Sequence, residues 1–227
     1  MTIAEARRPG LAVALFGLML LVLTLFAGCA SYTAKPVPVR KADAMPLSRI
    51  EGAVTIRIDP YFDVQRQKAV FDENLSDEDV LAVQVHVQNT GPGRVVLQPS
   101  EMAIEFPDGR SLLPSSAAMV AMKVTGGSGS LIGSGIAFGA VGFAVAWHAR
   151  EKAKAERIKD YGNKELQTVT LSQDESKHGF VFFIGPPNLT FREGTLTIRF
   201  VEAEGAATKV VRLPLAKATS SAVLDHR

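Results

Sequence analysis

The sequence predicts a mainly β protein: an antiparallel β-sandwich of about seven strands, interrupted by an inserted glycine-rich apolar helix that continues into a charged helix. Apolar and polar residues alternate along several short segments, most clearly along Val80–Asn89, and this is the period of a half-buried strand. Glycine, proline and asparagine form turns between these segments, as in Asn89–Gly93. An uncharged run, Leu131–Trp147, separates the strand segments into two groups.

The group before the apolar run holds three or four short strands. They are predicted at Ala53–Asp59, Val80–Asn89, Arg94–Gln98 and Met102–Phe106. Pro60 ends the first strand because it has no N–H to donate, and Pro107-Asp108-Gly109 forms a turn after the last. In Val80–Asn89, His86 falls on the polar face, which predicts an ordinary exposed histidine.

An acidic cluster lies between the first two strands, within Tyr61–Asp79. Its members are Asp72, Glu73, Asp77, Glu78 and Asp79. A calcium loop needs ligands at alternate residues, then a glycine and a distal glutamate, and this spacing does not match. We therefore expect a solvated loop in which Ser76 caps a short turn.

The group after the apolar run holds four strands, predicted at Leu166–Leu171, Phe180–Ile184, Thr195–Val201 and Lys209–Leu215. Phe180–Ile184 is apolar throughout, which predicts a buried central strand. Neither group is large enough alone, so we expect both to share one sandwich. The expected common core is Leu81, Val83, Val85, Phe180, Phe182, Leu196 and Ile198.

The strand group before the apolar run also carries a family resemblance. Its alternation, with the Asn89-Thr90-Gly91 and Asp108-Gly109 turns, resembles the Ig-like β-sandwich domains of many bacterial surface lipoproteins. The resemblance implies an Ig-like sandwich that serves as an interaction module.

The first 29 residues predict an export signal. Arg7 and Arg8 precede the apolar stretch Leu11–Cys29, which ends at the single cysteine of the chain. Phe26-Ala27-Gly28-Cys29 resembles the lipobox of bacterial lipoproteins. The resemblance implies cleavage before Cys29, acylation of Cys29 and a lipid anchor. Because residue 30 is alanine and not aspartate, it also implies sorting to the outer membrane, facing the periplasm.

The alternative for this stretch is an uncleaved membrane helix, since it is almost long enough to span a bilayer. The polar stretch with two prolines that follows Cys29, Ser31–Pro38, is typical of a tether and favours the lipoprotein.

Charge and cysteine content argue against nucleic-acid binding, disulfides and cysteine metal sites. The chain has 25 Lys and Arg and 23 Asp and Glu residues. Cleavage would remove Arg7, Arg8 and Glu5, leaving 23 basic and 22 acidic residues and a net charge of +1. We therefore expect no nucleic-acid binding. With Cys29 acylated, no thiol remains for a disulfide or a metal site. The four histidines have no metal-ligand spacing, and no cofactor or small-molecule substrate is predicted.

Leu131–Trp147 has the composition of a membrane or packing helix. Gly135, Gly139 and Gly142 recur at helical spacing and form a stripe of small residues, which lets helix backbones approach closely. Trp147 ends the run, as at a membrane interface. A short helix is expected before it, at Ser115–Val124, and a charged helix after it, at His148–Asp160.

If both strand groups form one domain, this segment cannot cross a membrane once, because a single crossing would separate them. It would re-enter, form a hairpin with Ser115–Val124, lie along the surface or pack in an oligomer. A further alternative is a helix buried across the sandwich.

The chain thus divides into six parts: signal peptide 1–28, lipidated tether 29–50, first sandwich part 51–113, inserted segment 114–165, second sandwich part 166–216 and tail 217–227. We predict a non-catalytic envelope lipoprotein that docks on membrane or partner helices, with an envelope protein or a second copy as partner. The alternative is an oligomeric membrane-assembling protein, a pore or collar. A hydrolase is not expected, because the chain has no Gly-x-Ser-x-Gly after a strand and no His-Glu-x-x-His.

Overall fold

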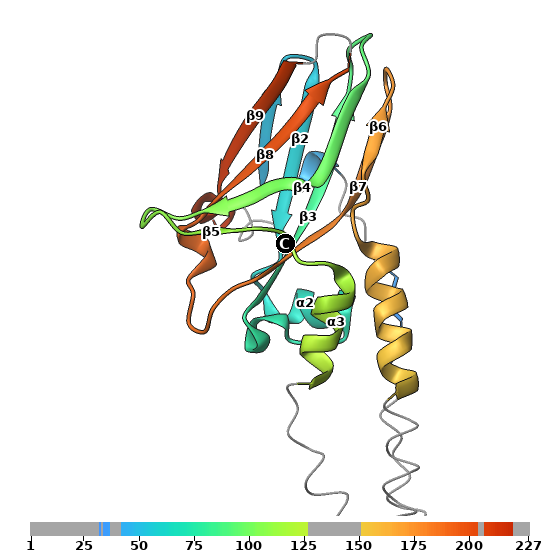
Figure 1. Ribbon diagram of the computed structural model, residues 1–227, viewed down its shortest axis with the longest axis vertical. Helices are drawn as coiled ribbons and strands as arrows, with labels where there is room; N and C mark the ends of the chain where they lie inside the picture. Colours follow the sequence, from blue (N-terminus) through green and yellow to red (C-terminus); the bar gives the residue numbers. More distant parts are fainter. Residues whose placement is uncertain (1–31, 33, 37–41, 127–150, 204–206, 220–227) are drawn as a thin grey trace, which may run out of the picture.

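The computed structural model describes residues 32, 34–36, 42–126, 151–203 and 207–219. In this part of the chain, nine strands form two antiparallel sheets that pack against each other, and helices gather at one end (Figure 1). The mainly β sandwich predicted from the sequence is confirmed.

Each sheet combines strands from both sides of the apolar segment. The first sheet has the order β1 (Leu47–Glu51), β2 (Val54–Pro60), β3 (Val80–Asn89), β7 (Ser176–Ile184). The second has the order β5 (Ser111–Leu112), β4 (Val95–Glu105), β8 (Thr195–Glu202), β9 (Ala207–Pro214), and β6 (Val169–Leu171) also pairs with β4. The strands that precede residues 127–150 and those that follow them therefore pair within the same two sheets.

The strands differ from the sequence prediction at several places. β5 was not predicted, β6 begins at Val169 and not at Leu166, and β7 begins at Ser176 and not at Phe180. β1 extends the sandwich back to Leu47, into the range expected to be tether, because Leu47 is buried opposite Ile58. The two strands expected at Arg94–Gln98 and Met102–Phe106 form the single strand β4, whose register against β8 shifts between Leu97 and Met102.

The core between the sheets follows the alternation in the sequence. Leu81, Val83 and Val85 of β3 pack with Leu196 and Ile198 of β8, and all are almost fully buried. Phe180 and Phe182 do not join them, so this part of the predicted core is wrong. Their neighbours Val181 and Phe183 point into the sandwich, opposite Val83 and Leu81. The error arises because both faces of β7 are covered, so an apolar run does not reveal which residues point inward.

β7 is buried but lies at the edge of its sheet, which corrects the predicted central position. Its free edge is covered by two backbone hydrogen bonds: Ser115 N donates to Phe182 O at 2.8 Å, and Leu166 N donates to Phe180 O at 2.8 Å. Gly179 allows this approach, since a Cβ there would lie 2.7 Å from the Cα of Leu166.

Helices cover the outer face of β3 and β7 and form what we call the helical layer. It consists of α2 (Val64–Phe71), the 3-10 turn η2 (Leu75–Glu78), α3 (Ala117–Gly126) and a helix over residues 151–164. Three further 3-10 turns lie elsewhere: η1 (Ala42–Ala44), η3 (Phe191–Glu193) and η4 (Leu215–Thr219).

The solvated loop expected at Tyr61–Asp79 is thus wrong. Asp63 caps α2 by accepting a hydrogen bond from Arg66 N at 2.8 Å. Phe71 and Leu75 are fully buried against the sheet. The acidic residues remain on the outside of this ordered helical unit.

Aromatic rings form the centre of this second core. Phe71 contacts four other rings, those of Tyr61, Tyr161, Phe180 and Phe182, with centroid distances from 5.0 to 6.2 Å. Tyr161 belongs to the helix over 151–164, which continues past its expected end at Asp160 because its last turn is packed against α2. The described helices include none that is both long and apolar enough to cross a membrane.

Candidate functional site at the tether

The residues predicted to act at the membrane lie outside the described residues. They are Cys29, Gly135, Gly139, Gly142 and Trp147. Residues next to them are described, however. Tyr32 follows Cys29 by three positions, and α3 and the helix over 151–164 flank the apolar segment. The end of α3 and the start of the helix over 151–164 lie at the same end of the molecule (Figure 1).

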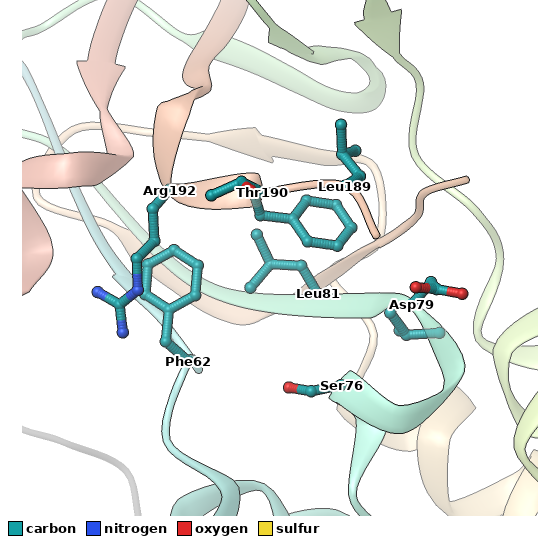
Figure 2. Close-up of a pocket in the computed structure, with 9 residues that line it drawn as sticks. Phe62, Ser76, Asp79, Leu81, Leu189, Thr190 and Arg192 are labelled. Carbon is teal, nitrogen blue, oxygen red and sulfur yellow. The ribbon is translucent and has the colours of Figure 1, made fainter. Parts of the chain in front are cut away.

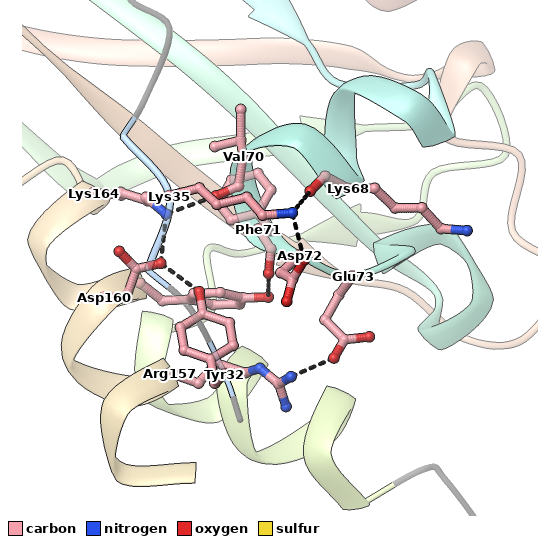
Figure 3. A network of polar contacts seen from close by, with 11 residues as sticks. Tyr32, Lys35, Lys68, Val70, Phe71, Asp72, Glu73, Arg157, Asp160 and Lys164 are labelled. Atoms are coloured by element: carbon pink, nitrogen blue, oxygen red, sulfur yellow. Dashed lines mark hydrogen bonds and ion pairs between the residues drawn. The ribbon is translucent and has the colours of Figure 1, made fainter. Parts of the chain in front are cut away.

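Tyr32 is buried in the helical layer, with 7% of its surface exposed. Its ring meets the ring of Tyr161 edge-on, at a centroid distance of 6.5 Å. The guanidinium of Arg157 lies 4.8 Å from the centre of the Tyr32 ring, within cation–π range. The tether therefore packs on the helix over 151–164 at this residue, as Figure 3 shows.

A buried polar chain continues from the Tyr32 hydroxyl. It donates to Asp160, which also accepts a hydrogen bond from the ammonium of Lys164. Lys164 donates in turn to the carbonyl of Val70 at the end of α2, at 2.7 Å. Burial of an ion pair costs less free energy when the remaining hydrogen-bonding groups of both ions have partners. The Tyr32 hydroxyl supplies such a partner to Asp160.

Burial is the main cause that raises the pKa of Tyr32, and its hydrogen bond to Asp160 and the charge of Asp160 act in the same direction. The phenol therefore stays protonated at neutral pH and keeps its proton for Asp160. Burial likewise raises the pKa of Tyr161, whose hydroxyl donates to the carbonyl of Phe71 at 3.1 Å. Both phenols act as fixed donors.

Arg157 joins the elements around Tyr32. Its guanidinium pairs with Glu73 beside α2 and donates to the hydroxyl of Thr125 in α3 at 2.9 Å. Burial raises the pKa of Glu73 in spite of the opposing charge of Arg157. Farther along the tether, Lys35 pairs with Asp72 and donates to the carbonyl of Lys68 at 3.2 Å. We call Tyr32, Lys35 and their partners Asp72, Arg157, Asp160 and Lys164 the tether site.

α3 presents an apolar face to solvent next to the tether site. Ala117, Val120, Ala121 and Val124 point inward and are buried, the spacing of one helical face. Met119 and Met122 point outward, with 53% and 45% of their surface exposed. These two flexible side chains form a small apolar surface on α3.

A separate cavity of about 340 Å³ lies where the α2 entrance, η2 and the β7–β8 connection meet. Figure 2 shows Leu81 and Leu189 in its wall and the guanidinium of Arg192 against the Phe62 ring, at 4.1 Å from the ring centre. Asp79 accepts a hydrogen bond from Asn188 N at 3.3 Å, and Ser76 accepts one from Gln67 at 2.8 Å. The side chains that line the cavity are thus tied to neighbouring segments, and none of them is a histidine or cysteine.

Among the described residues, no group of three or more His, Cys, Asp or Glu side chains is arranged to hold a metal ion. His86 and His178 face each other across β3 and β7. Burial, the neighbouring Arg57 and His178 lower the pKa of His86. His86 is half-buried, and not exposed as expected from its polar face.

Tyr32 was not predictable as a contact residue, because Ser31–Pro38 has the composition of a polar tether. One signal was present: an aromatic residue in a stretch of small and polar ones. The chain has three tyrosines, and Tyr32, Tyr61 and Tyr161 all lie in the helical layer. The tether site can hold a chain segment in place through ring packing and buried hydrogen bonds.

Comparisons with known proteins gave remote structural likeness only. No protein-family model and no curated protein matches the chain. The yjhA protein of Bacillus subtilis is 11% identical, with a TM-score of 0.37, over 73% of this chain and 94% of yjhA. The ycdA protein of Bacillus subtilis, described as a "putative lipoprotein", is 13% identical, with a TM-score of 0.36, over 76% of this chain and 41% of ycdA. A functionally unknown protein of Listeria monocytogenes is 10% identical, with a TM-score of 0.36, over 81% of this chain and 97% of its own length.

Proposed function

We propose that the protein is a non-catalytic envelope lipoprotein, anchored through acylated Cys29, whose sandwich serves as an interaction module. The observation that carries this proposal is the burial of Tyr32, three residues after the lipobox cysteine. A residue that docks three positions after the proposed anchor would hold the folded part at a short and fixed distance from the membrane. A mature protein that begins at Cys29 gains a defined link between its anchor and its folded part.

The anchor is strong enough for this role. One acyl chain gives only marginal membrane binding, whereas two or three give a stable anchor. By resemblance to lipoproteins of two-membrane bacteria, Ala30 assigns the protein to the outer membrane, facing the periplasm. The exposed strand edges and strand-end loops of the sandwich would then be open to an envelope protein partner.

The geometry also favours a second candidate function, self-assembly through Gly135, Gly139 and Gly142. Arg157 bonds to Thr125 at 2.9 Å, so the two helices that flank the apolar segment are neighbours. A segment that leaves and returns at neighbouring helices can re-enter a membrane or meet copies of itself. If it assembles, changing Gly139 to Leu abolishes detergent-resistant oligomers, because the larger side chain separates the helix backbones.

Fatty-acid labelling tests the anchor. Cells that express the wild-type protein should transfer labelled palmitate to it, and the Cys29→Ser variant should receive none. Matched expression of a Cys29-intact variant with an exposed substitution, Ala34→Ser, controls for export and abundance. Label on the Cys29→Ser variant would show that the assignment is wrong.

A further inference from the structure

We infer that the docked tether holds the end of the helical layer formed by α3 and the helix over 151–164 against the lipid surface, with Met119 and Met122 on the membrane-contacting side. This inference rests on the proposed acylation of Cys29. It adds an orientation and a contact surface, which a lipid anchor alone does not provide.

The first step is the reach of the chain. An extended chain covers at most about 3.6 Å per residue, so Cys29 lies within about 11 Å of Tyr32. If Tyr32 were free, the tether would next be held at Lys35, which pairs with Asp72, and the six residues from Cys29 to Lys35 could span about 22 Å. Docking of Tyr32 therefore halves the reach of the anchor and fixes it at one point of the surface.

The second step is where that point lies. Arg157 contacts both the Tyr32 ring, at 4.8 Å, and Thr125 in the last turn of α3, at 2.9 Å. Met122 precedes Thr125 by three residues, which is about 4.5 Å along a helix axis. The acyl chains on Cys29 thus enter the membrane close to the exposed methionines of α3.

The third step is the chemistry of the surface. Met119 and Met122 are flexible, apolar side chains, and they are exposed on a helix whose other face is buried. On the neighbouring helix, the exposed Lys152 pairs with Glu156, so this helix adds no free positive charge there. The contact with the membrane is therefore expected from the apolar methionines, which suit the boundary between acyl chains and headgroups.

The opposite end of the sandwich provides a control position. Val54, at the start of β2, pairs with Asn89, and Thr90 N donates to Ala53 O at 2.9 Å. β2 then runs to Pro60, next to the helical layer. The exposed Pro92, which follows β3 at the Val54–Asn89 end, therefore lies a strand length away from the helical layer.

The test uses the full-length lipidated protein in phosphatidylethanolamine–phosphatidylglycerol vesicles that contain a headgroup spin-labelled lipid. Since Cys29 is acylated, Met122→Cys or Pro92→Cys provides a single thiol for a fluorophore. We expect strong quenching of the label at position 122 and little at 92. Equal quenching at both positions, or none at 122 in protein that is bound to vesicles, would overturn the inference.

Tyr32→Ala together with Lys35→Ala, added to the Met122→Cys variant, tests the tether itself, because Lys35 also holds the tether through Asp72. Quenching at position 122 should fall to the level seen at position 92, and Ala34→Ser should leave it unchanged. Quenching that persists in the variant with both substitutions would show that the tether does not hold this orientation. Absence of fatty-acid incorporation in the parent protein would instead contradict the proposed lipoprotein, so the two failures are distinguishable.

Discussion

Phe182 is the residue whose removal tests the two-core architecture most sharply. It is fully buried, stacks on Tyr161 at a centroid distance of 6.0 Å and meets Phe71 edge-on at 5.7 Å. Truncation to alanine removes these contacts and leaves a cavity, which costs about 3–5 kcal/mol. For a domain of this size, each kcal/mol lowers the melting temperature by about 2–4 °C. We therefore expect the melting temperature of the Phe182→Ala variant to be roughly 6–20 °C lower than that of the wild-type protein.

The assay is urea unfolding of the full chain in detergent, followed by far-UV circular dichroism, so that free energies of unfolding can be compared. Val210→Ala is the matched control, since this side chain is 37% exposed and its loss should cost no more than about 0.5 kcal/mol. A loss below about 1 kcal/mol for Phe182→Ala, which is in the range of surface changes, would refute the burial argument.

A double-mutant cycle locates Phe182 in its layer. Combined with Phe71→Leu in the helical layer, the effects should be non-additive by about 0.5–3 kcal/mol, because the rings touch. Combined with Ile198→Val between the sheets, they should add to within about 0.5 kcal/mol. The opposite pattern would place Phe182 in the sandwich core.

Three further predictions follow from the same structure. A fragment that ends at Leu113 should show no cooperative unfolding, because it lacks β6 to β9 and thus part of both sheets; a sharp transition would contradict the shared sandwich. Gly179→Ala should cost about 1–3 kcal/mol by overpacking, since its Cβ would lie 2.7 Å from backbone atoms of Leu166, and unchanged stability would show that this edge contact is dispensable. Because the pKa of His86 lies below its ordinary 6.5, the unfolded state takes up a proton more readily as the pH falls through 6.5, so the folded state should lose stability there. The loss should be smaller in His86→Gln, as measured by melting temperatures at pH 7.5 and pH 5.

β3 was predictable although both of its faces are covered. Its outward positions Ala82, Gln84 and His86 are small or polar, so the apolar inward residues Leu81, Val83 and Val85 show the alternation of a strand. In β7 the residues on both faces are apolar, so the sequence does not show which of them point into the sandwich. The backbone hydrogen bonds that cover the free edge of β7 come from distant segments, which no local pattern encodes.

α2 was missed for a related reason. Its sequence, Val64–Phe71, contains two glutamines, an arginine and a lysine and suggests a surface. Yet Gln67 is almost fully buried, because its amide bonds to the carbonyl of Tyr61 at 2.7 Å and to Ser76 at 2.8 Å. A polar residue that is buried through tertiary hydrogen bonds cannot be recognised from composition.

The candidate site, too, was only partly predictable from the sequence. The sequence identified Cys29 through a motif, whereas Tyr32 became significant only when Asp160 and Arg157 were brought to it from more than a hundred residues away. The apolar segment with Gly135, Gly139 and Gly142 stays a prediction, since it lies outside the described residues.

Mass spectrometry of the N-terminal peptide of the protein, purified from membranes, determines whether Cys29 is the acylated first residue. We expect a mature chain that begins at Cys29, with two or three acyl chains on that residue and none of residues 1–28 present. A chain that retains residues 1–28, with a free thiol on Cys29, would show that the protein is not a lipoprotein.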